Sequence, residues 1–315
     1  MIDALLNFDF MRYSLISGIL IGFIAPLIGA FIVVRRLSLI ADALSHVTLG
    51  GISFGMFLLT IMPTLVFINP MWFGILFAIV GALLIEKLRT SYTAYQEIAI
   101  PIIMSAGIAL SAIFISLADG FNQEIVGLLF GSISAVNISD LTTIIVIAII
   151  VVLFITLFYK ELFILSFDEE YSKVIAIIVV LFITLFYKEL FILSFDEEYS
   201  KVIGIHKWIQ FLFIVIVAMV ISASMRVVGI LLVSALITLP IAISMRITKS
   251  FKQLILLSVF LGELSVILGL VLAFYMDISP GGVIVVLLVI LLMITMAYQK
   301  MRMKFKKGAN INEYK

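Results

Sequence analysis

The residues with the clearest chemistry are Asp42 and His46, which lie in a long apolar stretch. Their spacing of four places a carboxylate and an imidazole on one face of a helix. If Arg36 marks the cytoplasmic surface, a rise of about 1.5 Å per residue puts His46 roughly 15 Å deep, near the midplane of a bilayer core about 30 Å thick. Such a pair suits a divalent cation such as zinc or manganese. The alternative on spacing alone is that the two side chains bond each other or a neighbouring helix.

Few other side chains could complete such a site. The only other histidine is His206, and the sequence has no cysteine. An all-histidine site within one chain is therefore impossible, and thiolate sites are excluded. A site at Asp42 and His46 would be incomplete, or shared between two chains, which suits passage of a metal better than storage. Glu263, also in an apolar stretch, could line a pathway or bond a neighbouring helix.

These residues must be positioned by helices in a membrane. The chain has 315 residues, of which 64% are hydrophobic and 12% charged, with a net charge of +1. A soluble domain is about half apolar and about a quarter charged, so lipid must be the solvent. This composition excludes a soluble globular protein, a disordered chain and a nucleic-acid binder.

No nucleotide-binding loop, nucleophile elbow or HExxH motif is present, so we predict no enzyme. Any energy for transport must then come from another subunit or from an ion gradient.

The hydropathy pattern predicts an all-α polytopic protein with about eight or nine transmembrane helices. The segments expected to cross are 12–34, 38–60, 64–86, 97–117, 140–159, 208–224, 228–245, 253–275 and 280–298. Residues 118–139 are expected to form an outer loop with a short helical or re-entrant piece. Basic residues in the loops and in the tail 300–307 place the tail in the cytoplasm and the N-terminus outside.

Part of the sequence is written twice. Residues 146–175 and 174–203 carry the same thirty letters at an offset of 28. Such identity indicates a recent in-frame tandem duplication or an assembly error, not the diverged units of a repeat protein. Removing one unit leaves 315 − 28 = 287 residues. We expect residues 1–315 to form one transmembrane domain that carries this duplication.

A charged segment, 194–206, lies between two apolar stretches. Its acidic residues come early and Lys201 comes late, as in a short helix that Gly204 could end. A short charged helix facing the cytoplasm could dock a partner, although a solvated linker is the alternative. The upstream copy of this segment continues into Ala176 instead of glycine.

Five motifs in combination resemble one transporter family. They are RRLSLIADALSHVTLGGI (35–52), LLFGSISAVNISDL (128–141), SFDEEYSKVIGI (194–205), VVGILLVSALITLPIAISM (227–245) and DISPGGVIVV (277–286). They resemble the membrane permeases of zinc/manganese-type ABC importers, and look most like the zinc-uptake permeases of Gram-positive bacteria. With one repeat unit removed, the resemblance covers essentially the whole chain.

The resemblance implies a multi-pass permease of the bacterial cell membrane, acting as a homodimer with two cytoplasmic ATPase subunits and an extracellular metal-binding lipoprotein. It implies that Asp42 and His46 line the path of a transported metal, with zinc expected and manganese or iron as alternatives, and that no cofactor is permanently bound. The charged segment would be the ATPase-coupling helix, with its key residues at Asp196, Glu197, Glu198, Tyr199 and Gly204.

The duplication puts a second coupling segment upstream, at Asp168, Glu169, Glu170 and Tyr171. Between the two lie thirteen apolar residues, 174–186, which span about 20 Å as a helix and fall short of the bilayer core. One extra crossing would also put the basic tail outside. We therefore predict that the extra unit does not cross the membrane and that it impairs coupling to the ATPase. In a competing arrangement, the second apolar copy displaces the first from the membrane.

Two other classes of function fit the same residues. A secondary transporter could be driven by protons, with Asp42 or Glu263 as the relay. A membrane scaffold would transport nothing.

Overall fold

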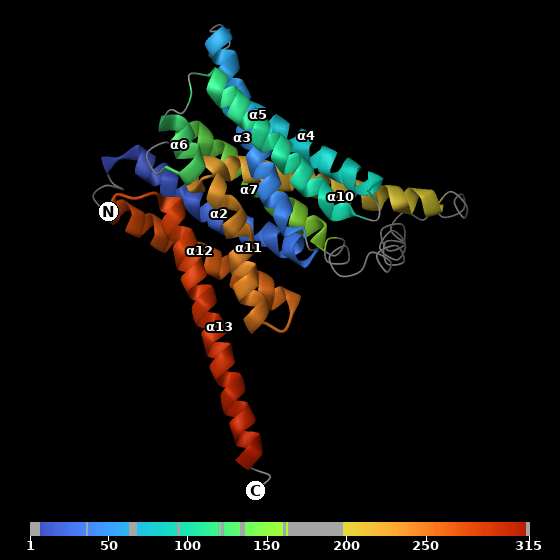
Figure 1. The fold of residues 1–315 in the computed structure, drawn as a ribbon, viewed down its shortest axis with the longest axis vertical. Helices are drawn as coiled ribbons and strands as arrows, with labels where there is room; N and C mark the ends of the chain where they lie inside the picture. The colour runs from blue at the N-terminus through green and yellow to red at the C-terminus, as the bar shows by residue number, and fades with distance from the viewer. Residues whose placement is uncertain are drawn as a thin grey trace.

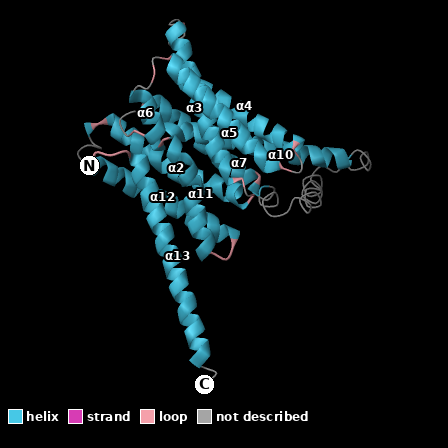
Figure 2. Ribbon diagram, viewed as in Figure 1, coloured by secondary structure: helices cyan, strands magenta, loops and turns pink. Residues whose placement is uncertain are grey.

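The computed structural model describes residues 7–35, 37–62, 68–92, 95–118, 120, 123–132, 136–159, 162 and 198–312. In this part of the chain every regular element is a helix (Figure 2). The helices are α2 Asp9–Val34, α3 Ser38–Ile61, α4 Pro70–Ser91, the 3₁₀ turn η2 Gln96–Ile98, α5 Ala99–Leu117, α6 Gln123–Phe130, α7 Ile138–Leu157, α10 Glu198–Val228, α11 Ile230–Ile247, α12 Phe251–Met276 and α13 Pro280–Asn312.

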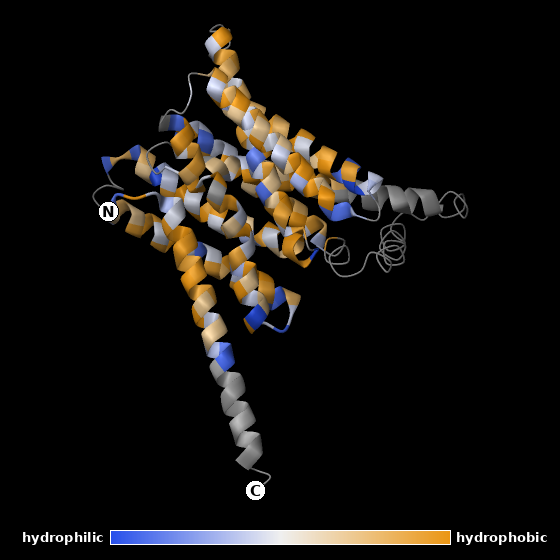
Figure 3. Ribbon diagram, viewed as in Figure 1, coloured by the Kyte–Doolittle hydropathy of each residue, from blue (hydrophilic) through white to orange (hydrophobic). Residues whose placement is uncertain are grey.

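The long helices form an apolar bundle (Figure 1). Among the described residues, seven helices are long and apolar enough to cross a membrane, and α10 and α11 add the shorter apolar stretches Phe211–Met225 and Leu232–Ile247. Hydrophobic residues run along most of each helix, and hydrophilic ones gather near helix ends (Figure 3). Large apolar side chains on the outside, such as Leu256 (62% exposed) and Phe260 (61% exposed), need lipid around them. The prediction of an all-α polytopic membrane protein is confirmed.

One predicted boundary is wrong by several residues. The span expected at 64–86 is α4, Pro70–Ser91. The Asn69 side chain accepts a hydrogen bond from the Met71 backbone N–H at 3.0 Å, and Pro70 occupies the first turn. An asparagine cap followed by proline is a strong helix start, which hydropathy alone does not detect.

Within the segment 118–139, the expected short helical piece is the helix α6, whereas the outer location of the segment stays a prediction. Asn137 then begins α7 through a capping box: its side chain accepts from the Asp140 N–H at 2.9 Å, and the Asp140 carboxylate accepts from the Asn137 N–H at 3.1 Å. Asp277 ends α12 in the left-handed conformation, as a cap residue would.

Two packing features organise the bundle. At one end, the buried Phe31 ring makes edge contacts with Tyr159, Phe213 and Phe251, at centroid distances of 6.2, 6.3 and 5.3 Å. These contacts join α2 to α10, α12 and the residues after α7. Aromatic pairs of this geometry each contribute about 0.5–1.5 kcal/mol beyond their buried area.

At the other end lies what we call the glycine junction, made of Gly131, Gly229 and Gly281. Gly131 and Gly229 have φ of 78° and 88°, which only glycine adopts freely. A Cβ on Gly131 would lie 2.6 Å from the Val227 carbonyl oxygen, and one on Gly281 would meet the Val228 carbonyl oxygen. The backbones that follow α6, join α10 to α11 and begin α13 therefore touch directly.

The first repeat copy contributes its apolar run to the bundle. α7 contains residues 146–157 of the first copy, with Ile147, Val151 and Phe154 buried in the bundle. Its first residues, including Asp140 of the capping box, precede the repeat and have no equivalent before the second copy, whose apolar run follows a charged segment. α7 is therefore built from the first copy, whereas the apolar run of the second copy lies outside the described residues and its placement stays a prediction.

The end of α7 and the start of α10 lie on the same face of the bundle, toward the right of Figure 1. Residues 163–197, which hold most of the repeated unit, lie outside the described residues.

Candidate metal pathway

Asp42 and His46 lie one helical turn apart on α3, and both side chains are half-buried. The residues between and around them, Ala43, Leu44 and Val47, are buried, whereas Leu39 one turn earlier is 59% exposed. The pair therefore faces the less covered side of α3. In the described part of the chain no hydrogen bond or ion pair joins the two side chains, so their mutual pairing is not what the structure shows.

No third ligand gathers beside the pair. Among the described residues, no group of three or more His, Cys, Asp or Glu side chains lies close enough to hold a metal ion. Asp42 and His46 thus offer one oxygen-bearing and one nitrogen-bearing side chain per chain. A zinc or manganese ion takes four or more ligands, so the remaining ones must come from water or from another chain.

On one side, α5 fixes the backbone at His46. The Ser111 hydroxyl lies 2.7 Å from the Gly107 carbonyl oxygen in its own helix and 3.2 Å from the His46 carbonyl oxygen on α3. A Cβ on Gly107 would lie 2.8 Å from the Val47 nitrogen, so only glycine permits this approach. Sequence reasoning missed both residues, although two small residues four apart in an apolar helix are a known signal of close helix packing.

On another side, α10 contacts the same turn of α3. The Thr48 hydroxyl donates to the Leu44 carbonyl oxygen at 2.7 Å, and its oxygen lies 3.2 Å from the Ser222 hydroxyl oxygen. Both side chains are fully buried. Since Thr48 has used its single proton, Ser222 is the donor in this contact. This pair was also missed, because it joins segments far apart in the sequence.

Glu263 lies in a different part of the bundle. It is half-buried near the middle of α12, whose main neighbours are α2, α11 and α13. Its Cα lies 3.4 Å from where a Cβ on Gly22 would be, so it sits against α2. The structure does not bring Glu263 together with Asp42 and His46.

The coupling residues are only partly described. Glu198 and Tyr199 begin α10, whereas Asp196, Glu197 and the upstream copy Asp168, Glu169, Glu170 and Tyr171 lie outside the described residues. The expected helix stop at Gly204 is wrong, because α10 continues unbroken to Val228. A glycine inside a helix costs about 1 kcal/mol relative to alanine, which the following helix-compatible residues overcome.

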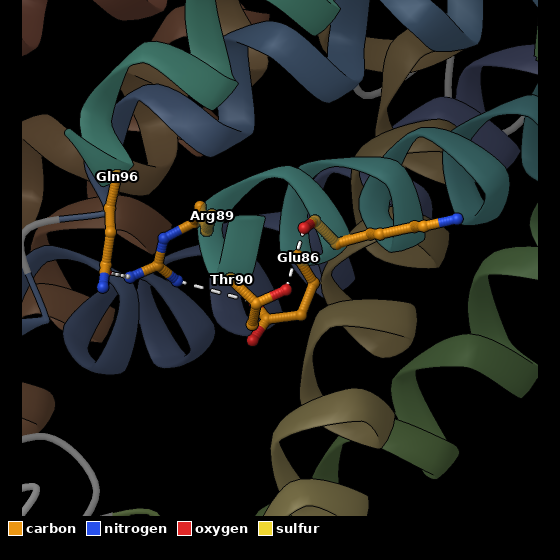
Figure 4. A network of polar contacts seen from close by, with 5 residues as sticks. Glu86, Arg89, Thr90 and Gln96 are labelled. Atoms are coloured by element: carbon orange, nitrogen blue, oxygen red, sulfur yellow. Dashed lines mark hydrogen bonds and ion pairs between the residues drawn. The ribbon is translucent and has the colours of Figure 1, made fainter. Parts of the chain in front are cut away.

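A polar network fastens the turn between α4 and α5 (Figure 4). Arg89 lies 3.5 Å from a Glu86 carboxylate oxygen and donates to the Gln96 side chain at 3.3 Å. The Thr90 hydroxyl donates to the Lys87 carbonyl oxygen at 2.8 Å. This network lies on the face predicted to be cytoplasmic, and the Arg89–Gln96 bond links α4 to the turn η2 that precedes α5.

Comparison with known proteins places the chain in a family. The ABC 3 transport family matches residues 7–179 and 172–299, two segments that overlap within the repeated unit. The chain belongs to this family. It is a multi-pass membrane protein, as are its relatives in bacterial transport systems.

Individual proteins that resemble the chain are membrane proteins of metal transport systems. The chain is 28% identical to a manganese transport system membrane protein, MntC, of Listeria monocytogenes, covering 99% of each chain. It is 29% identical to the manganese import system permease protein ScaB of Streptococcus gordonii, covering 90% of this chain and 89% of ScaB. The solved structure of PsaBC from Streptococcus pneumoniae in complex with Fab is similar with a TM-score of 0.73 and 26% identity, covering 93% of each chain.

Proposed function

We propose that the chain is the membrane-spanning subunit of an ATP-driven importer of divalent transition-metal ions. The observation that carries the proposal is the half-buried Asp42–His46 pair on one face of α3, in a chain of the ABC 3 transport family. The metal is cargo, and Asp42 and His46 are transient ligands whose small number favours release. ATP hydrolysis belongs to a separate cytoplasmic subunit, which α10 contacts through its first residues.

Two copies of the chain would complete the site. Helix α5, which packs closely on α3, presents small exposed residues on its outer face: Ser105, Ala106, Ala109, Ala112 and Ser116. Small residues let two membrane helices approach closely. A homodimer formed at this face would bring a second Asp42 and a second His46 toward the first pair, for four side-chain ligands. A metal-binding lipoprotein would deliver the ion from outside.

The cargo is manganese or zinc. Relatives are described as manganese transport proteins, which supports manganese. The motifs look most like those of zinc-uptake permeases, and a mixed carboxylate–imidazole set accepts both ions. The test is uptake of each metal into liposomes that hold the chain, its ATPase and its binding protein. Uptake that needs no ATP but follows a proton gradient would overturn the proposal.

The extra repeat unit lowers transport. It sits directly before the residues that contact the ATPase, and the shared face of the α7 and α10 ends supports a unit that stays on that side. An added segment there crowds the docking surface. We expect the 287-residue deletion variant to transport faster than the 315-residue chain at equal protein levels. Equal rates would contradict the effect assigned to the duplication, and an extracellular tail in cysteine labelling would contradict its placement.

A further inference from the structure

Helix α10 reaches from the coupling residues to the far end of the bundle. It runs from Glu198 to Val228 without interruption, 31 residues or about 46 Å. This exceeds a bilayer core of about 30 Å, so its first turns project beyond the bundle, as Figure 1 shows on the right. Its last residue meets the glycine junction at Gly229.

The second half of α10 has no free side. From Phe213 to Val228 the described side chains are buried, except for the half-buried Val215 and Met219. Seven helices contact α10: α2, α3, α4, α6, α7, α11 and α13. Because such interiors are close-packed, a displacement of α10 cannot be absorbed by lipid and must move its neighbours.

Among these neighbours, α3 is hydrogen-bonded to α10 next to the residues proposed to bind the metal. The Ser222 hydroxyl donates to Thr48, and Thr48 donates to the Leu44 carbonyl oxygen. These bonds therefore hold α3 both two residues before and two residues after His46. The Ser111 hydroxyl of α5 approaches the His46 carbonyl oxygen from another direction, and it shares its single proton between that oxygen at 3.2 Å and the Gly107 carbonyl oxygen at 2.7 Å. The turn that carries His46 therefore lies between α10 and α5. Only α10 begins at the coupling segment.

We infer that the Ser222–Thr48 contact is the point at which α10 passes motion from the coupling segment to the helix that carries Asp42 and His46. The inference rests on the proposed function, since it names the positioning residues that link ATP hydrolysis to the metal path. A buried hydroxyl pair resists sliding more than an apolar contact does, because each shift breaks a bond that no water replaces. Ser222 and Thr48 are positioning residues and bind no metal themselves.

The test measures metal uptake per ATP hydrolysed in liposomes containing the chain, its ATPase and its binding protein. The variants are Ser222→Ala, Thr48→Val and the double variant. Ser224→Ala is the matched control, because the Ser224 hydroxyl is equally buried but bonds only to Val220 of its own helix, at 2.7 Å. Thr48→Ser keeps the hydroxyl. Manganese binding to the permease in detergent, without ATPase, is measured in parallel.

We expect each single variant to lower the uptake-per-ATP ratio about threefold or more, with the double variant no worse than either single one, since both remove one contact. In these variants, manganese binding and ATP hydrolysis should stay within about twofold of the parent chain. The uptake-per-ATP ratio of Ser224→Ala and of Thr48→Ser should stay within the same range. An unchanged ratio, additive losses, or a loss fully explained by weaker manganese binding would overturn the inference.

The same experiment in the 287-residue variant separates the two levels of the proposal. If neither unsubstituted chain imports metal with ATP, the proposed function fails. If either chain imports metal while all substitutions leave its ratio unchanged, the proposed function stands and the Ser222–Thr48 inference fails.

Discussion

Helices α3 and α12 both carry ionisable side chains within an apolar bundle, but their surroundings differ. α3 lies among α4, α5, α10 and α11, and hydroxyl contacts bind it to two of them beside His46. α12 has a broad exposed apolar face, and Glu263 lies at the edge of that face against α2. A charged residue at membrane depth therefore suggests a function most strongly where the surrounding helices fix the backbone that presents it.

The largest effect should come from the pair on α3. Asp42→Asn and His46→Ala each remove a side chain proposed to bind the metal, so we expect ATP-driven metal uptake to fall by more than about tenfold, since even supporting residues of metal sites cost 10–100-fold. Uptake in liposomes checks this, and size-exclusion chromatography checks that each variant folds. Uptake near the parent rate from both variants would sink the assignment of the site and remove the contrast with α12.

The next effect concerns the backbone that presents His46. Gly107→Val places a side chain against the Val47 backbone, so we expect a loss of about 1–3 kcal/mol in stability from overpacking, and less folded protein after heating. Gly127→Ala is the control, because its Cβ would meet only Ser132 at an ordinary 3.6 Å. Equal thermal stability of the two variants would show that α5 does not need its close approach to α3.

A smaller effect should follow from Ser111→Ala. Losing one hydrogen bond costs about 1 kcal/mol, or roughly a fivefold change in an equilibrium constant. We expect the metal concentration for half-maximal uptake to rise by up to that factor, with little change in maximal rate. Ser265→Ala serves as the comparison, because its buried hydroxyl donates to the Leu261 carbonyl oxygen at 2.7 Å within α12, away from α3. An identical response of the two variants would mean that Ser111 does not position His46.

The smallest effect is expected at Glu263. Glu263→Gln keeps the shape and removes the charge at a site away from α3, so uptake should stay within about twofold, as for substitutions far from a site. A tenfold loss in the same liposome assay would place α12 on a transport pathway and erase the difference between the two helices.

Much of the fold follows from hydropathy, because each span must bury its backbone in helical hydrogen bonds and its side chains in lipid or neighbours. The nine apolar segments and the short helix α6 all follow from local patterns. The start of α4 and the continuity of α10 through Gly204 were mispredicted, since a cap overrides hydropathy and a long helix outweighs one glycine.

The sequence predicts the ionisable residues of the candidate site but not the hydroxyl side chains that contact the same turn of α3. Asp42 and His46 stand out because ionisable residues are rare in apolar helices. Ser111, Thr48 and Ser222 do not, because their importance arises from which helix faces meet, and serine or threonine in a membrane helix commonly bonds its own preceding turn.

The glycine junction has a consequence for how the chain is made. Gly131 and Gly229 leave the ribosome well before Gly281, and no side chain at these positions can hold the backbones together in the meantime. The backbones at Gly131 and Gly229 can meet before α13 is made, and the third backbone, at Gly281, joins them only when α13 enters the membrane. A truncation before Pro280 would insert most of its helices and still lack a closed outer end, which makes the last span a checkpoint for assembly rather than a mere anchor.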